Sequence, residues 1–167
     1  MAIHEHHARL LRVVTLARSM HHPAIYLRPP LDASAMERLR AASERVFAPY
    51  PAIAAVYLYG SGARAEPLAD LDIAVLAERG AAVVSLEPLA AALQAEGAPH
   101  GPDIDMRALR GTGPRFRANV IGEGRVIFER SRNTRIVFEA ETMIEWLDYK
   151  PTWQRMRARM LDRWIHG

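Results

Sequence analysis

Two acidic residues separated by one position follow a short loop that contains glycine and serine. The stretch from Tyr57 to Leu76 reads Tyr-Leu-Tyr-Gly-Ser-Gly-Ala-Arg-Ala-Glu-Pro-Leu-Ala-Asp-Leu-Asp-Ile-Ala-Val-Leu. Alternate side chains of a β-strand share a face, so we expect Asp70 and Asp72 to point the same way and Leu71 the other way. Like charges held this close are costly unless a cation lies between them, and a hard divalent cation such as Mg²⁺ prefers carboxylate oxygens. The spacing therefore predicts a pair of metal-binding carboxylates.

The Gly60-Ser61 pair supplies the other half of a possible site. Small residues allow close approach of the backbone, and free N–H groups at the start of a helical turn from Ser61 would bind a phosphate. Phosphate beside paired carboxylates indicates metal-assisted phosphoryl or nucleotidyl transfer. The alternative is a surface turn with Asp70 as a strand cap. The tandem placement of both motifs at strand boundaries favours the site.

The elements that must position these residues follow from periodicity and from turn-forming residues. We expect strands at 53–59, 70–76, 103–108 and 125–129, and helices at 33–47, 86–95, 115–121 and 134–165, the last interrupted at Pro151. Asp32 is the expected N-cap of the helix at 33–47, with Ser34 and Glu37 as an alternative capping box. This order of elements predicts an α+β sheet packed by helices.

The length of 167 residues indicates one core domain with appended segments. We expect an N-terminal extension and linker at 1–31, with a helix at 8–20, a core at 32–130 and a C-terminal helical segment at 131–167. The extension carries five histidines that could be proposed as a metal site, but histidines near a terminus without acids at fixed spacing are more often solvated. They are His4, His6, His7, His21 and His22.

Composition excludes several classes of protein. The chain has no cysteine, which excludes disulfide frameworks, thiol nucleophiles, zinc ribbons and iron–sulfur clusters and favours a cytoplasmic location. The N-terminus does not read as a signal peptide, and no apolar run approaches the roughly 20 residues that span a bilayer. A net charge of +3 permits an anionic partner without demanding nucleic acid.

The C-terminal segment combines arginines with aromatic residues, which could indicate RNA binding. The simpler interpretation is an amphipathic helix whose arginines lie in water and whose apolar side chains face the core, namely Trp153, Met156, Met160 and Trp164. We therefore do not expect nucleic acid as a direct substrate. The same arginines could contact an acidic partner.

The stretch from Gly60 to Asp72 resembles the signature of the nucleotidyltransferase superfamily with the polymerase β-type palm. It is most similar to the minimal, MNT-type members, which pair with HEPN-domain toxins in prokaryotic toxin–antitoxin modules. Gly60 and Ser61 match the family's Gly-Ser, and Asp70 and Asp72 match its Asp-X-Asp. Arg64 lies on the loop, where the family often has arginine. The resemblance extends over residues 32–165 through the segments 104–107, 113–117, 122–129 and 147–152.

The resemblance implies a small mixed β-sheet with helices on one side, followed by C-terminal helices and preceded by an N-terminal helical extension. It also implies that Asp70 and Asp72 bind two Mg²⁺ ions and that Asp105 completes the second site and acts as a general base. Asp103 lies on the same strand face as Asp105 and is the alternative third acid.

The same resemblance implies the remaining ligands and the reaction. Gly60, Ser61 and Arg64 would bind ATP. The expected reaction is transfer of AMP from ATP to a tyrosine of a partner HEPN-domain ribonuclease toxin. Two alternatives remain: a non-catalytic antitoxin that acts by binding, and a small-molecule nucleotidyltransferase of the antibiotic-modifying kind. The second would need a concave pocket, which is usually built from a further domain or long loops that this chain lacks.

Overall fold

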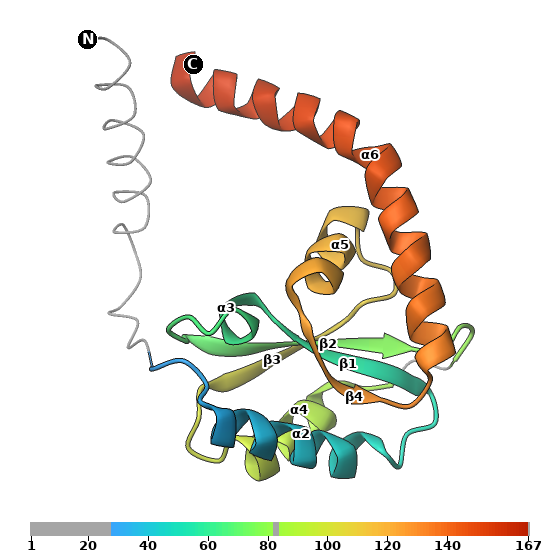
Figure 1. The fold of residues 1–167 in the computed structure, drawn as a ribbon. Helices are drawn as coiled ribbons and strands as arrows, with labels where there is room; N and C mark the ends of the chain where they lie inside the picture. The colour runs from blue at the N-terminus through green and yellow to red at the C-terminus, as the bar shows by residue number, and fades with distance from the viewer. Residues whose placement is uncertain (1–27, 82–83, 167) are drawn as a thin grey trace.

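A computed structural model describes residues 28–81 and 84–166. Its centre is a mixed four-stranded sheet with the strand order β3-β2-β1-β4 (Figure 1). The strands are β1 (Ile53–Tyr59), β2 (Asp70–Ala77), β3 (Asp103–Ala108) and β4 (Arg125–Glu129). β1 pairs antiparallel with β2 and β4, whereas β2 and β3 run parallel. The expected α+β class is confirmed, and β1, β3 and β4 occupy the predicted residues.

Helices cover both faces of the sheet, and not only the one face that was expected. Helices α2 (Ala33–Phe47) and α4 (Glu87–Gly97) bury their apolar sides against one face, through residues such as Leu39 and Leu93 (Figure 1). Helices α5 (Pro114–Glu123) and α6 (Arg132–His166) pack on the other face, where Val120 and Phe138 form a cluster with Tyr57. The short α3 (Gly60–Ala63) joins β1 to the loop before β2.

The start of α2 is fixed by the predicted cap. The Asp32 carboxylate accepts a hydrogen bond from the backbone N–H of Ala35 at 2.7 Å, which satisfies one of the free donors at the helix N-terminus. The extension just before this cap is tied to the loop after α3, because Arg28 and Leu68 exchange two backbone hydrogen bonds of 2.8 Å. Leu68 itself is buried, so the loop between α3 and β2 is pinned to the core.

Helix α6 is continuous from Arg132 to His166, so the predicted interruption at Pro151 is wrong. Proline lacks one N–H and crowds the preceding turn, which commonly bends a helix without ending it. Figure 1 shows α6 bent between its two halves. Although α6 has 35 residues, neither it nor any other helix in the described ranges is long and apolar enough to cross a membrane.

The first half of α6 is held on the body by a polar network. The Tyr57 hydroxyl donates to Glu139 Oε1 at 2.9 Å, and Arg135 bonds both Glu139, at 2.8 Å, and Glu129 of β4. Burial and the neighbouring Glu139 raise the pKa of Tyr57, so its hydroxyl stays protonated and can donate. This network holds the first turns of α6 against the sheet.

The second half of α6 contradicts the predicted burial of its apolar stripe. Trp153 is partly buried, and the Arg115 guanidinium lies over its ring at 4.2 Å. Met156, Met160 and Trp164 are instead exposed. Periodicity identified a common face of the helix, but it could not show that the body of the fold ends before that face does. The helix expected at 8–20 and the five histidines lie outside the described residues.

Candidate active site

Four aspartates and one tyrosine meet on one face of the sheet, at the end where β2 and β3 begin. Asp70 is the register partner of Asp103, and Asp72 lies between Asp105 on β3 and Tyr59 on β1. Leu71 is fully buried on the opposite face, as the alternation predicted. The parallel pairing of β2 with β3 therefore places the two acidic pairs of the sequence side by side.

Gly60 packs directly against the carboxylate of Asp72. Its φ is +65°, a backbone conformation that favours glycine, and a Cβ built on it would lie 2.3 Å from Asp72 Oδ2. No side chain could stand here without displacing that carboxylate. Ser61 follows in the first turn of α3 and is partly buried, and among the described residues its hydroxyl has no hydrogen-bond partner. The Gly-Ser pair thus borders the acids, as predicted.

The clustering of carboxylates has a clear electrostatic signature. Burial raises the pKa of Asp72, and the charges of Asp70 and Asp105 raise it further. Arg107 and Arg64 act in the opposite direction. Burial and then the Asp72 charge also raise the pKa of Tyr59 to about 12. Asp72 is therefore the carboxylate on which the field of the other acids converges.

Asp105 is occupied by an ion pair on its own strand. Arg107 stands two residues further along β3, on the same face, and donates two hydrogen bonds to Asp105 Oδ2, from Nη2 at 2.6 Å and from Nε at 3.0 Å. The charge of Arg107 is also felt by Asp72 and by Tyr59. The Arg107 guanidinium therefore places a positive charge inside the acidic cluster.

Arg64, a predicted ATP ligand, forms ion pairs with acids on both sides. It donates to Glu66 at 3.0 and 3.1 Å and to Glu123 at the end of α5 at 2.9 Å. All three side chains are substantially exposed, so these pairs exchange readily with solvent or an anion. In this arrangement Arg64 joins the loop to α5.

The donor set fits Mg²⁺ at two of its three acids. Asp70 and Asp72 offer neighbouring carboxylates that form no ion pair within the described part of the chain, and the lack of a side chain at Gly60 leaves the Asp72 carboxylate in place. Asp105 fits only when Arg107 has moved off it. Within the described ranges, no group of three His, Cys, Asp or Glu side chains is arranged to hold a metal ion.

The sequence analysis missed two members of this cluster. Tyr59 was expected only as the last residue of the strand at 53–59, but it is partly exposed and makes an edge-to-face contact with Phe116 at 5.4 Å. Arg107 was noted only as part of a motif. Both could have been found from the alternation rule, because Arg107 stands two positions from Asp105 and Tyr59 ends the strand next to Gly60.

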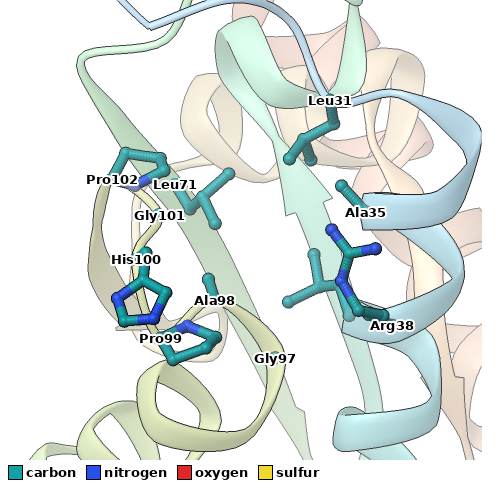
Figure 2. Close-up of a pocket in the computed structure, with 11 residues that line it drawn as sticks. Leu31, Ala35, Arg38, Leu71, Gly97, Ala98, Pro99, His100, Gly101 and Pro102 are labelled. Carbon is teal, nitrogen blue, oxygen red and sulfur yellow. The ribbon is translucent and has the colours of Figure 1, made fainter.

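A separate pocket of about 320 Å³ lies on the opposite face of the sheet. Figure 2 shows its lining between the start of α2 and the turn after α4, with Leu71, Ala35 and Pro99 around it. Since Leu71 points away from Asp70 and Asp72, the pocket does not adjoin the acidic cluster. It is therefore not the place where a nucleotide would meet these carboxylates.

The sequence pattern of the family "Polymerase beta, Nucleotidyltransferase" matches residues 43–133, more than half of the chain. The protein belongs to this nucleotidyltransferase family. The match spans the whole sheet and contains Gly60, Asp72 and Asp105. None of the curated proteins matches the chain.

Solved structures with the same fold come from toxin–antitoxin complexes. A chain of the tri-AMPylated Shewanella oneidensis HEPN toxin in complex with MNT antitoxin has 19% identity and a TM-score of 0.59, over 75% of this chain and 98% of that one. A chain of a toxin–antitoxin structure with AMP-PNP has 20% identity and a TM-score of 0.59, over 73% and 98%. A mutant of the MntA–HpeT complex gives 18% identity and a TM-score of 0.60, over the same shares. At these identities the likeness shows a common fold.

Proposed function

We propose that this nucleotidyltransferase is an MNT-type antitoxin that transfers AMP from ATP to a tyrosine hydroxyl of a partner HEPN-domain toxin in the cytoplasm. The family supports nucleotidyl transfer as the reaction. The neighbour with a tri-AMPylated toxin supports the acceptor, and the neighbour with AMP-PNP supports ATP as the donor. The observation that carries the proposal is the position of the Asp72 carboxylate. It packs against Gly60, where a side chain would displace it, and it lies close enough to Asp70 and Asp105 for their charges to raise its pKa.

The reaction needs a nucleophile, a held triphosphate and a proton acceptor. The acceptor oxygen forms a bond to the α-phosphorus of ATP, the bond from that phosphorus to the bridging oxygen breaks, and pyrophosphate leaves with the electron pair. Asp70 and Asp72 would hold Mg²⁺, which supplies charge neutralisation for the triphosphate and lowers the pKa of the acceptor hydroxyl. Asp105 would complete the second site and take the hydroxyl proton.

The remaining predicted ligands would hold the phosphates. Gly60 and Ser61 offer backbone N–H groups next to the acids, together with a hydroxyl that has no hydrogen-bond partner among the described residues. Arg64 would reach the phosphates by exchanging its contacts with Glu66 and Glu123, which are exposed and cost little to break.

The test uses the cognate HEPN-domain protein as the acceptor, with ATP and Mg²⁺, followed by intact mass spectrometry of that acceptor. We expect additions of one or more AMP units that disappear with Asp72→Asn. Asp103→Asn is the matched control, because it removes the same charge from the same face of the sheet. Loss of transfer in Asp103→Asn but not in Asp105→Asn would overturn the assignment of the third acid.

One observation favours a second candidate, an antitoxin that acts by binding alone. The Arg107–Asp105 pair occupies the third carboxylate, as a cation fixed in the protein would do in a site that no longer needs metal. An acceptor that remains unmodified, yet is still neutralised by the wild type and by Asp72→Asn, would establish this function instead.

A further inference from the structure

The guanidinium of Arg107 lies inside the acidic cluster, yet the proposed reaction gives it no role. Arg107 is exposed and lies on the same face of β3 as Asp105. Its positive charge lowers the pKa of Asp72 more than the charge of Arg64 does. Arg107 therefore contributes more positive potential at Asp72 than Arg64, the arginine that the sequence predicted as an ATP ligand.

The contact with Asp105 uses only part of what this guanidinium can donate. Both of its hydrogen bonds, from Nε and from Nη2, end on the same oxygen, Asp105 Oδ2. Nη1 of Arg107 has no hydrogen-bond partner among the described residues. A guanidinium binds an anion more strongly when two parallel N–H groups meet two of its oxygens. A phosphate group would therefore be a better partner for Arg107 than Asp105 is in this arrangement.

The pair with Asp105 is also easily broken. The Arg107 and Asp105 side chains are 59% and 40% exposed, and exposed ion pairs contribute little to stability. Arg64 is held by two acids, Glu66 and Glu123. Release of Arg107 breaks one ion pair, whereas release of Arg64 breaks two. Arg107 is therefore the arginine that is more readily freed.

The proposed reaction itself requires this release. Asp105 can neither hold a cation nor accept a proton through the oxygen that Arg107 occupies. The phosphates of ATP would also bring negative charge to a face that already carries four aspartates, so positive charge is needed beside them. Movement of the guanidinium from Asp105 to the phosphates meets both requirements at once.

We propose that Arg107 is a phosphate-binding residue that changes partners, leaving Asp105 to hold the triphosphate of ATP. The inference rests on the proposed function, in that the nucleotide is the one positioned at Asp70 and Asp72. The guanidinium neutralises the bound phosphates and the charge that collects on pyrophosphate as it leaves. Asp105 is freed for its own role only while nucleotide is bound, so the empty site is held inactive.

The test is titration calorimetry of the full chain with ATP and, separately, with pyrophosphate, both at saturating Mg²⁺. Arg107→Gln is expected to weaken binding of each ligand at least tenfold, because a hydrogen bond between two charged groups is lost. Arg107→Lys keeps the charge without the planar fork and is expected to lose about threefold. Arg45→Gln is the matched control, because it breaks a 2.7 Å ion pair with Glu96 whose side chains are 60% and 41% exposed, between α2 and α4. It is expected to change affinity less than about twofold.

The direction of the change separates phosphate binding from simpler roles. If Arg107 only competed for Asp105, Arg107→Gln would bind ATP with Mg²⁺ as tightly as the wild type or more tightly, and that result overturns the proposal. Loss of binding of Mg²⁺ alone together with ATP would also overturn it, since Arg107 would then support the site as a whole. Melting curves in EDTA check that each variant is folded.

The AMP-transfer assay decides the proposed function separately. If the wild type binds ATP through Arg107 but transfers no AMP to the HEPN-domain protein, the role of Arg107 is confirmed and the proposed function fails. If AMP is transferred while Arg107→Gln binds ATP as tightly as the wild type, the proposed function stands and this inference fails. A wild type that binds no ATP in the presence of Mg²⁺ overturns both and favours the antitoxin that acts by binding alone.

Discussion

The Arg107 guanidinium donates two hydrogen bonds to one oxygen of Asp105, at 2.6 and 3.0 Å, in the middle of an acidic cluster. An arginine on a would-be metal ligand competes with the metal, since both neutralise the same carboxylate. The pair is substantially exposed, so its strength lies in the range of up to about 1 kcal/mol. That is weak enough for a divalent cation to displace it.

We therefore predict that Arg107→Gln binds Mg²⁺ more tightly than the wild type. The expected change is about two- to fivefold in the Mg²⁺ concentration at half-saturation, which corresponds to the strength of an exposed ion pair. Thermal shift during a Mg²⁺ titration without nucleotide measures it, and Arg107→Lys should lie between the two. Equal half-saturation in all three proteins would show that Arg107 does not compete with the metal.

Asp72→Asn is expected to stop AMP transfer and yet stabilise the metal-free protein. Loss of a ligand at the reacting phosphate should cost at least about 10²- to 10³-fold in rate, the range seen when one electrostatic stabiliser is removed. The raised pKa of Asp72 means that the folded state binds its proton more tightly than the unfolded state. Stability from this group is therefore present at low pH and is lost as the pH rises from the ordinary value of 3.8 through the raised pKa.

Melting curves in EDTA across this pH range provide the check. Asp72→Asn should melt a few degrees above the wild type at pH 7, on the order of 2–4 °C for each kcal/mol, and the difference should vanish in acid. Added Mg²⁺ should raise the melting temperature of the wild type only. A variant that is inactive and also less stable at pH 7 would point to a structural role for Asp72.

The strands and the site-bearing loop could be predicted from the sequence because their signals are local. β1 ends where Gly60 begins the turn, and alternation alone placed Asp70 and Asp72 on one face. The Arg107–Asp105 pair could have been predicted from the same alternation, because the two residues are two positions apart on one strand. What local patterns could not supply was the parallel pairing of β2 with β3, which sets Asp72 beside Asp105.

Two predictions about α6 were wrong: the burial of its C-terminal apolar stripe and the interruption at Pro151. The spacing of Met156, Met160 and Trp164 correctly identifies a common face of a helix, but burial depends on whether another element reaches that face. The interruption expected at Pro151 is also absent, because the local signal of a proline does not decide whether the helix continues. One missing hydrogen bond in a helix of 35 residues can be tolerated by bending.

The anchor of α6 yields a prediction on stability. Tyr57→Phe removes a 2.9 Å hydrogen bond to Glu139 from a side chain that is 1% exposed. A bond to a charged acceptor contributes about 1.5–3 kcal/mol, but Arg135 still pairs with Glu139, so we expect a loss near the lower end. Urea unfolding measures it. Tyr50→Phe, at an exposed tyrosine, is the control and should cost under about 0.5 kcal/mol.

The contact between Gly60 and Asp72 yields the sharpest prediction about the site. Gly60→Ala places a methyl group 2.3 Å from Asp72 Oδ2 and also strains a backbone with φ +65°. Gly111→Ala is the matched control, because Gly111 has φ +83° and open space around its Cβ position. The backbone strain should cost each variant about 1–2 kcal/mol of stability. Only Gly60→Ala should also lose Mg²⁺-dependent binding of ATP in titration calorimetry, because only there does the carboxylate have to move. Equal binding by both variants at a temperature where both are folded would show that the position of Asp72 does not matter for the nucleotide, and the site would have to be sought elsewhere on the sheet.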